Sequence, residues 1–239
     1  MASLVTIERV SKKFGKLQVL DNIQLECRQG ASIALIGPNG CGKTTLIKCI
    51  LNMVIPDSGI ILFDGRDLKG DVQYRKHIGY MPQIGRYPEN MNVGQVLETI
   101  RNLRNDNSGI DEDLYHAYRM NDLLGKRMST LSGGTRQKVS AVIAFMFDPK
   151  VLILDEPTAG LDPLAADILK EKINVERKKN KLVLITSHLL SELDEIISEV
   201  IFMQDGVVRF HKHTDALKAD TGKESISKAI SHILKEELV

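Results

Sequence analysis

The residues with the clearest chemistry run from Gly37 to Thr45 and read GPNGCGKTT, which fits the phosphate-binding pattern G-x-x-x-x-G-K-[ST]. This segment follows an apolar run and precedes a helical run, Leu46 to Leu51, so it has the expected strand, loop and helix context. In such a loop, backbone N–H groups and the helix N-terminus converge on a phosphate. Lys43 is then expected to reach the β- and γ-phosphates, and Thr44 to ligate Mg²⁺. An ordinary glycine-rich turn is the alternative, and the full spacing disfavours it.

A second motif, VLILDE, covers Val151 to Glu156 and places two carboxylates at the end of an apolar run. The carboxyl ends of parallel strands form the crevice in which such sheets bind ligands. We therefore expect Asp155 to hold Mg²⁺ directly or through water, and Glu156 to polarise the water that attacks the γ-phosphate. A solvated loop carboxylate is the alternative for Glu156, but two carboxylates at the end of a buried strand are costly without a cation.

The segment Leu131 to Thr135 reads LSGGT and precedes a helical run that continues to Phe147. Ser132 has the residue type of a helix N-cap, and the two glycines ease the chain into the helix. A capped helix start with glycines and a hydroxyl is also an anion site. The local sequence does not separate these two interpretations.

The apolar patterns predict an α/β fold. Short continuous apolar runs at Ser32 to Ile36, Val151 to Leu154 and Leu182 to Thr186 are typical of parallel strands buried on both faces, and a helical pattern follows each. Leu4 to Val10 and Ile23 to Cys27 alternate apolar and polar residues, which predicts a half-exposed antiparallel pair. The expected architecture is a mostly parallel core sheet with right-handed crossovers and an N-terminal antiparallel β subdomain.

Helix signals replace strand signals between about residues 84 and 147, which predicts a helical subdomain inserted into a single domain of residues 1–239. Asn92, with Gln95 three residues later, predicts a helix start. Residues 215–239 are expected to form a helical tail that packs on its own domain. The apolar positions expected on one face of these two helices are Val96, Leu97, Ile100 and Leu103, and then Ile226, Ala229, Ile230, Ile233 and Leu234.

The composition limits the class of protein. The 239 residues are 43% hydrophobic and 26% charged, and 32 basic against 31 acidic residues leave a net charge of +1. Disorder and a strongly basic nucleic-acid binder are both disfavoured, so no nucleic-acid partner is expected. Three cysteines in no C-x-x-C pair fit a reducing cytoplasm. The N-terminus lacks the pattern of a secretory signal, and the longest apolar stretch, residues 141–147, is too short to span a bilayer, so any membrane role is expected to come through a partner.

Together the motifs resemble those of the ATP-binding cassette (ABC) ATPases. GPNGCGKTT, LSGGT, LDEPTAGLD at Leu154 to Asp162, and TSH ending in His188 follow one another in the order of that family. The resemblance implies a P-loop NTPase core with ATP and Mg²⁺ as its ligands. The departures from the common pattern are Cys41, where Ala or Ser is usual, and Thr135, where Gln is usual; neither removes a phosphate ligand. The nucleotide-binding residues implied in the first motif are Gly37, Pro38, Asn39, Gly40, Cys41, Gly42, Lys43, Thr44 and Thr45.

The resemblance implies further roles one residue at a time. Phe14 corresponds to the aromatic that stacks on adenine, and Gln83 to the glutamine that contacts Mg²⁺ or water. His188 corresponds to the histidine that contacts the γ-phosphate, and Asp162 to an aspartate that touches the opposite subunit. From the residues alone, Phe14 is a strand-end residue, Gln83 a turn residue, His188 a satisfied loop residue, and Asp162 with Pro163 a helix start.

The remaining histidine pair, His211 and His213, corresponds to nothing in the family pattern and is expected to be solvated rather than to bind a metal. In the family, the phosphate loop of one subunit faces the signature segment of another. In this chain the signature segment is LSGGT, Leu131 to Thr135. The resemblance therefore implies a dimer of this chain, with Ser132, Gly133 and Gly134 holding the ATP of the partner copy.

The resemblance also implies a role as the cytoplasmic ATPase subunit of a transporter, peripheral on the inner face of the membrane and driving a separate permease. The segment after Gln83 is the expected docking region, where Tyr87 and Met91 serve either as apolar anchors or in local packing. Tyr80 to Met91, the run LSGGTRQKVSA and the tail from Thr221 to Ile230 are similar to ABC-2 cassettes of the Nos type, whose transporters help to mature the copper sites of nitrous-oxide reductase. The alternative is a soluble ABC ATPase, such as one of iron–sulfur assembly.

Overall fold

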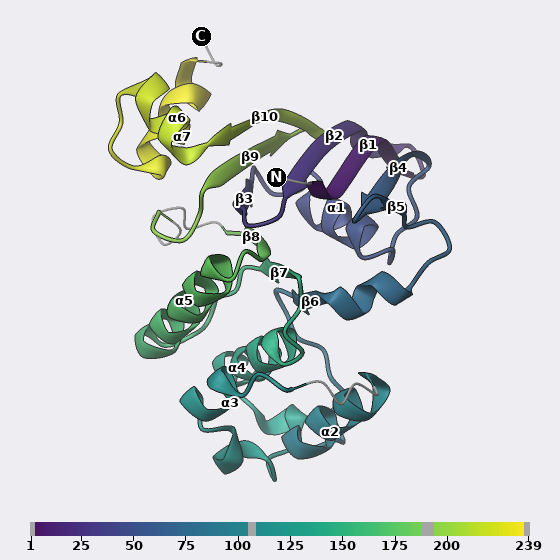
Figure 1. Ribbon diagram of the computed structural model, residues 1–239, viewed down its shortest axis with the longest axis vertical. Helices are drawn as coiled ribbons and strands as arrows, with labels where there is room; N and C mark the ends of the chain where they lie inside the picture. The colour runs from purple at the N-terminus through teal and green to yellow at the C-terminus, as the bar shows by residue number, and fades with distance from the viewer. Residues whose placement is uncertain (1–2, 105–108, 188–193, 237–239) are drawn as a thin grey trace. The chain divides into compact units, whose positions relative to one another are not determined.

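The computed structural model describes residues 3–104, 109–187 and 194–236, with side chains up to residue 233 in the last range. The chain divides into two compact units, residues 1–74 with 182–239, and residues 75–181. Each unit is described by itself, with the elements labelled as in Figure 1.

The first unit begins with an antiparallel sheet in the strand order β2-β1-β4-β5. Strands β1 (Ser3–Phe14) and β2 (Leu17–Arg28) pair antiparallel, which confirms the expected hairpin, and both are longer than the alternating pattern indicated. Strands β4 (Ser58–Phe63) and β5 (Arg66–Asp67) extend the sheet on the other side of β1. The register of β1 shifts between Ile7 and Val10, where the backbone of Arg9 has a φ of 51°, so a bulge interrupts the alternation.

The mostly parallel sheet of this unit is built around β3 (Ser32–Ile36), which lies between β8 (Leu182–Thr186) and β9 (Glu199–Gln204) and is parallel to both. All five residues of β3 and of β8 are buried, as their continuous apolar runs predicted. Strand β10 (Val207–His213) closes the sheet as the antiparallel partner of β9. The sequence patterns did not predict strands at β4, β9 or β10.

In the described part of this unit, three α-helices accompany these sheets. Helix α1 (Lys43–Ile50) follows β3 and ends where the Tyr74 hydroxyl donates to the carbonyl of Ile50 at 2.8 Å. Helices α6 (Thr214–Thr221) and α7 (Ile226–Glu236) pack on each other beyond β10 (Figure 1), so a helical tail does form. The side chain of Leu234 lies outside the described residues. The buried residues of α7 are Ile226, Ala229 and Ile230.

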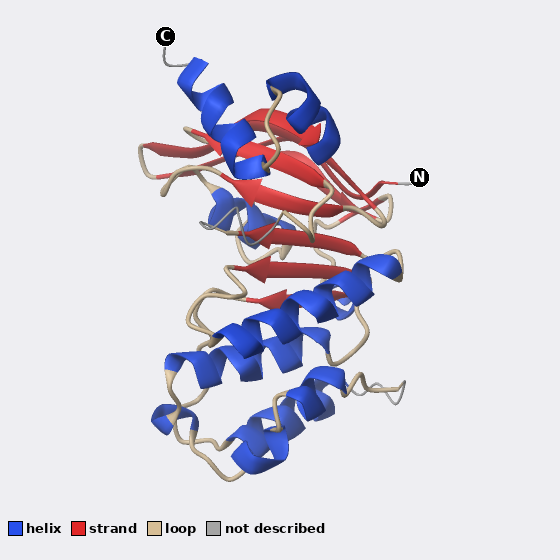
Figure 2. Ribbon diagram, turned by 90° about the vertical axis from the view of Figure 1, so that its left-hand side faces the viewer, coloured by secondary structure: helices blue, strands red, loops and turns tan. Residues whose placement is uncertain are grey.

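The second unit contains two parallel strands, β6 (Ile78–Met81) and β7 (Val151–Asp155), which pair in register with Met81 opposite Leu154. A 3₁₀ turn, Gln73–His77, leads into β6. Helix α4 (Gly133–Phe145) packs on β6, and Figure 2 shows how strongly helices predominate in this unit.

The described residues between β6 and β7 form helices and no strand: α2 (Val93–Arg104), α3 (Asp113–Ala117), α4 and two 3₁₀ turns, Met120–Leu123 and Met128–Thr130. No helix in the described part of the chain is long and apolar enough to cross a membrane.

The predicted start of α2 is confirmed in atomic detail. The Asn92 N–H donates to Gln95 Oε1 at 2.9 Å, and the Gln95 N–H donates to Asn92 Oδ1 at 2.8 Å, which is a reciprocal capping box. Val93, Val96 and Leu97 form the buried face of the helix. The expectation for Leu103 was wrong, since this side chain is 79% exposed. It lies in the last turn, one residue before the helix ends at Arg104, where the helical period alone does not specify a packing partner.

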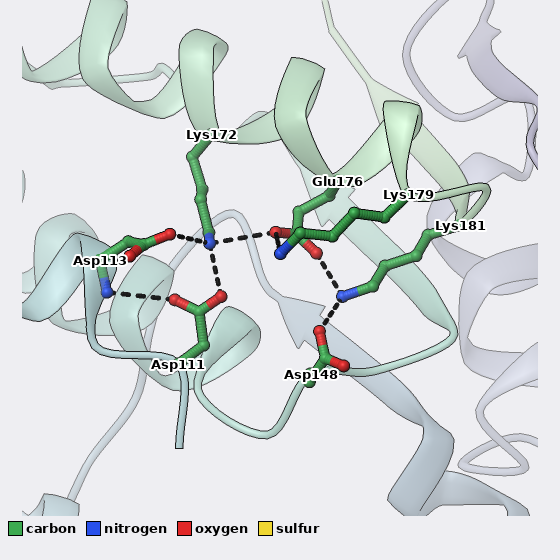
Figure 3. A network of polar contacts seen from close by, with 7 residues as sticks. All are labelled: Asp111, Asp113, Asp148, Lys172, Glu176, Lys179 and Lys181. Carbon is green, nitrogen blue, oxygen red and sulfur yellow. Dashed lines mark hydrogen bonds and ion pairs between the residues drawn. The ribbon is translucent and has the colours of Figure 1, made fainter. Parts of the chain in front are cut away.

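Helix α5 (Pro163–Lys178) anchors a buried network of charged groups (Figure 3). Lys172 lies 2.5 Å from Asp111, 2.6 Å from Asp113 and 3.0 Å from Glu176, measured between Nζ and the carboxylate oxygens. Glu176, whose side chain is 1% exposed, also pairs with Lys181 and, at 2.9 Å, with Lys179. The network therefore ties α3 and the segment before it to α5.

Each buried charge in this network depends on its partners. Burial alone would raise the pKa of Glu176, but the ammonium groups of Lys181, Lys179 and Lys172 hold it down to about 2 from 4.5. Burial would likewise lower the pKa of Lys172, and the carboxylates of Asp111, Asp113 and Glu176 raise it instead. A carboxylate with a lowered folded pKa stabilises the fold above its unfolded pKa, and this stabilisation is lost as the pH falls toward the folded pKa.

We therefore predict that Glu176→Gln lowers the free energy of unfolding by about 3 kcal/mol at pH 7, because Lys172 and Lys181 lose a buried partner. The difference from wild type should shrink as the pH falls from 4.5 toward 2, where the wild-type carboxylate becomes protonated. Urea unfolding at pH 7 and pH 3 measures this difference. Glu171→Gln, at an exposed position of the same helix, is the matched control and should change stability by less than about 0.5 kcal/mol. An equal loss for Glu176→Gln at both pH values would contradict the prediction.

Candidate nucleotide-binding site

The phosphate loop connects β3 to α1 in the first unit. Gly42 is the N-cap of α1 and has a φ of 107°, a backbone conformation that favours glycine. A Cβ at this position would lie 2.6 Å from the Val19 carbonyl oxygen, so a side chain is also excluded by the approach of β2. Because Gly42 supplies no capping side chain, the first N–H groups of α1 have no such acceptor and suit an anion.

Lys43 lies across this loop. Its Nζ donates to the carbonyl oxygens of Gly37 at 2.7 Å and Pro38 at 3.0 Å, so the ammonium is held within the loop. Thr44 is exposed in the first turn of α1, and Cys41, within the loop, is buried. Of the remaining loop residues, Thr45 is half-buried, and Pro38, Asn39 and Gly40 are exposed.

Phe14 belongs to the β1–β2 hairpin, whose second strand lies against Gly42 of this loop. It ends β1, pairs with Leu17 across the turn and is 51% exposed. The ammonium of Lys12 lies 5.5 Å from the centroid of its ring. The second strand of the same hairpin contacts Gly42 through Val19 and Leu20, so the structure brings the aromatic ring and the phosphate loop into one region of the first unit.

The acidic residues lie in the second unit, at the carboxyl edge of the β6–β7 pair. Asp155 is the last residue of β7 and is 6% exposed, and Glu156 follows it. Gln83 comes two residues after β6 and is exposed. Because the strands are parallel and in register, Gln83 and Asp155 leave the sheet at the same edge. Burial, with a smaller contribution from the Asp155 charge, raises the pKa of Tyr80 on β6 to about 12.

Ser132 is the N-cap of α4, as one interpretation of LSGGT predicted. The Thr135 N–H donates to Ser132 Oγ at 3.2 Å, and the two hydroxyl oxygens lie 2.8 Å apart. Gly133 has open space around it, since a Cβ there would contact nothing within 4 Å. A Cβ on Gly134, in contrast, would lie 2.4 Å from the Gly160 carbonyl oxygen. This second glycine is thus required by the close approach of α4 to the turn after β7.

Asp162 is the N-cap of α5, with Pro163 in the first helical position, as expected. The Ala165 N–H donates to Asp162 Oδ1 at 2.9 Å, and Lys138 Nζ lies 2.7 Å from Oδ2. The hydrogen bond from Lys138, followed by that from the Ala165 N–H, holds the pKa of Asp162 below its usual value. The carboxylate is thus ionised and paired with the signature helix α4.

Three predicted residues have other outcomes. His188 lies outside the described residues. His211 is 24% exposed and lies 2.6 Å from the buried carboxylate of Glu199, measured from Nε2 to Oε2, so it is paired rather than solvated. His213 is 66% exposed and lies 3.8 Å from that carboxylate, so it is solvated as expected. No cluster of His, Cys, Asp or Glu in the described segments is suited to hold a metal ion. Tyr87 packs locally, since its hydroxyl lies 2.9 Å from Ser140 Oγ on α4.

Two residues that the sequence analysis assigned no role also belong to this site, Gln137 and Lys138 on α4. Gln137 is 4% exposed and contacts the backbone of Glu156, and Lys138 contacts Asp162. A polar residue at position 137, three residues after the second glycine, was visible in the sequence. Its burial was not, because it depends on the packing of α4 against a segment about twenty residues away.

The fold and these motifs define a P-loop ATPase cassette of α/β class, with an antiparallel N-terminal sheet and a mostly parallel core sheet. The model of the ABC transporter family matches residues 20–159, and the chain belongs to this family. Nod factor export ATP-binding protein I of Ralstonia nicotianae is 28% identical over 212 residues, which cover 85% of this chain. The chain spans 65% of the length of that relative.

Solved structures agree with the fold. The ATP-binding subunit of an ABC transporter superposes with a TM-score of 0.88 and 26% identity over 97% of this chain and 100% of its own. A dimeric ATP-binding cassette in a post-hydrolysis state, bound to ADP and phosphate, has a TM-score of 0.76 and 21% identity over 87% of this chain and 98% of its own. The predicted fold class is thereby confirmed.

The two glycines of the signature segment provide a matched test of the packing of α4. We predict that Gly134→Ala lowers the melting temperature of the nucleotide-free protein, because the methyl group meets the Gly160 carbonyl and must displace the turn. Gly133→Ala should leave the melting temperature unchanged or raise it slightly, since alanine is the better helix former and the space is open. Differential scanning calorimetry measures both. Equal melting temperatures for the two variants would contradict the packing described.

Proposed function

We propose that this protein binds and hydrolyses ATP as the nucleotide-binding subunit of an ABC transporter. The observation that carries the proposal is the phosphate loop, where an uncapped helix start, an enclosed glycine and the ammonium of Lys43 occur together. Each of these features favours a bound phosphate group. Asp155 at the end of β7 and Glu156 after it supply the second requirement, oxygen ligands and a base for hydrolysis.

The donor set fits Mg²⁺, a hard cation that prefers oxygen ligands. The Thr44 hydroxyl, the Asp155 carboxylate and the Gln83 amide oxygen are the groups proposed to hold it. When bound, the metal ion would neutralise charge on the phosphates. Lys43 would exchange its contacts with the Gly37 and Pro38 carbonyls for contacts with the β- and γ-phosphates.

Glu156 is proposed to orient and polarise the attacking water through its carboxylate. Phe14 is proposed to stack on the adenine, and His188 to contact the γ-phosphate. Ser132, Gly133 and Gly134 are proposed to bind the nucleotide held by a second copy of the chain, in which Asp162 also lies at the contact. ATP would then favour the closed dimer over the open one, and this difference in affinity can do work on a partner.

The partner proposed is a separate transmembrane permease, through which the chain would associate with the inner face of the cell membrane. The Nos-type branch is a narrower hypothesis that rests on the similarity of Tyr80 to Met91, the signature segment and the tail. The competing proposal is a soluble ABC ATPase, for example one of iron–sulfur assembly. The identity of the bound partner distinguishes a transporter subunit in general, the Nos-type branch and the soluble ATPase.

We predict that Glu156→Gln retains ATP binding, loses ATP hydrolysis and accumulates as a dimer with ATP, because an amide cannot act as the base. Phosphate release and size-exclusion chromatography measure the two effects. Glu171→Gln is the control, since it makes the same change at an exposed position, and it should hydrolyse ATP at the wild-type rate. A Glu156→Gln protein that stays monomeric and active would refute the mechanism.

The partner can be identified by capturing Glu156→Gln with ATP from mild-detergent membrane extracts, followed by mass spectrometry. A multi-spanning protein at fixed ratio is expected from the transporter function. A copper-site maturation factor bound to that permease would support the Nos branch. Recovery of soluble assembly proteins alone would refute the transporter role and leave the ATPase chemistry in place.

A further inference from the structure

One stripe of α4 holds the turn that carries the acidic residues. Gln137 and Lys138 come three and four residues after Gly134, so all three lie on one face of the helix. Gly134 meets the Gly160 backbone, Gln137 the backbone at Glu156, and Lys138 the carboxylate of Asp162. The first two turns of α4 therefore contact the segment 156–162 at three places. Gln137 contacts its first residue, Gly134 approaches Gly160 near its end, and Lys138 contacts its last residue.

Gln137 makes the contact nearest to the proposed base. Its Nε2 lies 3.3 Å from the carbonyl oxygen of Glu156 and 3.5 Å from that of Pro157. The side chain is 4% exposed, so these contacts are shielded from water, and a buried amide donor requires such acceptors. A long polar side chain in the interior is thus directed at the backbone of two consecutive residues.

The backbone at Glu156 is in an unfavourable conformation. Its φ is 50°, in the left-handed region that costs a residue with a Cβ about 1 kcal/mol or more. Such a conformation persists only where the surroundings impose it. The Ala159 N–H donates to the Glu156 carbonyl at 3.1 Å, and Gln137 donates to the same oxygen, so two donors hold this peptide group.

We propose that Gln137 is a positioning residue for ATP hydrolysis, which sets the direction of the Glu156 carboxylate by fixing the peptide plane that follows it. This inference rests on the proposed role of Glu156 as the base. It also links the signature helix to hydrolysis within the same chain. A shift of α4 when Ser132 engages a nucleotide of the second copy would reach Glu156 through Gln137, one helical turn further on.

The test uses Gln137→Met in the full-length protein, because methionine has a similar length and no N–H donor. The kcat for ATP hydrolysis is expected to fall about 10- to 100-fold, the effect of a small displacement of a reacting group. The dissociation constant for ATP, measured in a Glu156→Gln background where only slow residual hydrolysis is expected, should change less than twofold. Ser140→Ala is the control: it removes a buried polar group of α4 that contacts Tyr87 instead, and should keep kcat within twofold.

A double-mutant cycle separates positioning from general disruption. If Gln137 acts through Glu156, adding Gln137→Met to Glu156→Gln should lower the residual hydrolysis no further. An unchanged kcat in Gln137→Met, or full additivity of the two losses, would overturn the inference. If Gln137→Met does not fold, Gln137→Glu is used, since it keeps the shape and replaces the donor by an acceptor. Wild-type hydrolysis by Glu156→Gln is a different result, which would refute the proposed base itself.

Discussion

The close packing of α4 against the turn after β7 is the contact on which the position of Glu156 in the second unit depends. It requires a glycine at position 134, where the helix backbone approaches the Gly160 carbonyl, and a buried donor at position 137. The turn it holds contains a strained residue, Glu156, and ends in the capped start of α5 at Asp162. Strain in one residue is tolerated here because several neighbouring contacts specify the same backbone conformation.

The same unit also relies on charge pairing in its interior. Lys172 and Glu176 are nearly inaccessible to water, and each has more than one opposite charge around it. Removing one partner leaves a buried charge unpaired, which costs several kcal/mol. Replacing the whole pair by apolar residues often costs little. Such a network therefore acts mainly by destabilising arrangements in which the partners are separated. It constrains α3 and the segment from Asp111 onward to one position against α5.

In the first unit, the phosphate loop is organised by backbone groups rather than by side chains. The carbonyls of Gly37 and Pro38 hold the ammonium of Lys43, and the N–H groups at the start of α1 lack a side-chain acceptor. A loop arranged in this way presents positive charge without a large rearrangement, which lowers the entropic cost of binding an anion. The hairpin of β1 and β2 supports it from one side through Val19.

The sequence by itself determined the elements whose signals are local. Continuous apolar runs identified β3, β7 and β8, alternation identified the β1–β2 hairpin, and the capping pair Asn92 and Gln95 identified the start of α2. Motif spacing placed the phosphate loop, the carboxylates at the end of β7 and the cap at Ser132. These features depend on residues within a few positions of one another, so one amino-acid sequence was enough to predict them.

Only the tertiary structure decided which side chains are buried and which distant residues they contact. Leu103 has the right period for a buried face but lies exposed at the end of α2, because the period does not specify a partner there. Gln137 is an unremarkable polar residue in the sequence, and becomes a buried donor to Glu156 only because α4 packs on a segment about twenty residues away. Such contacts arise from packing between elements, and the spacing of residues in the sequence does not predict them.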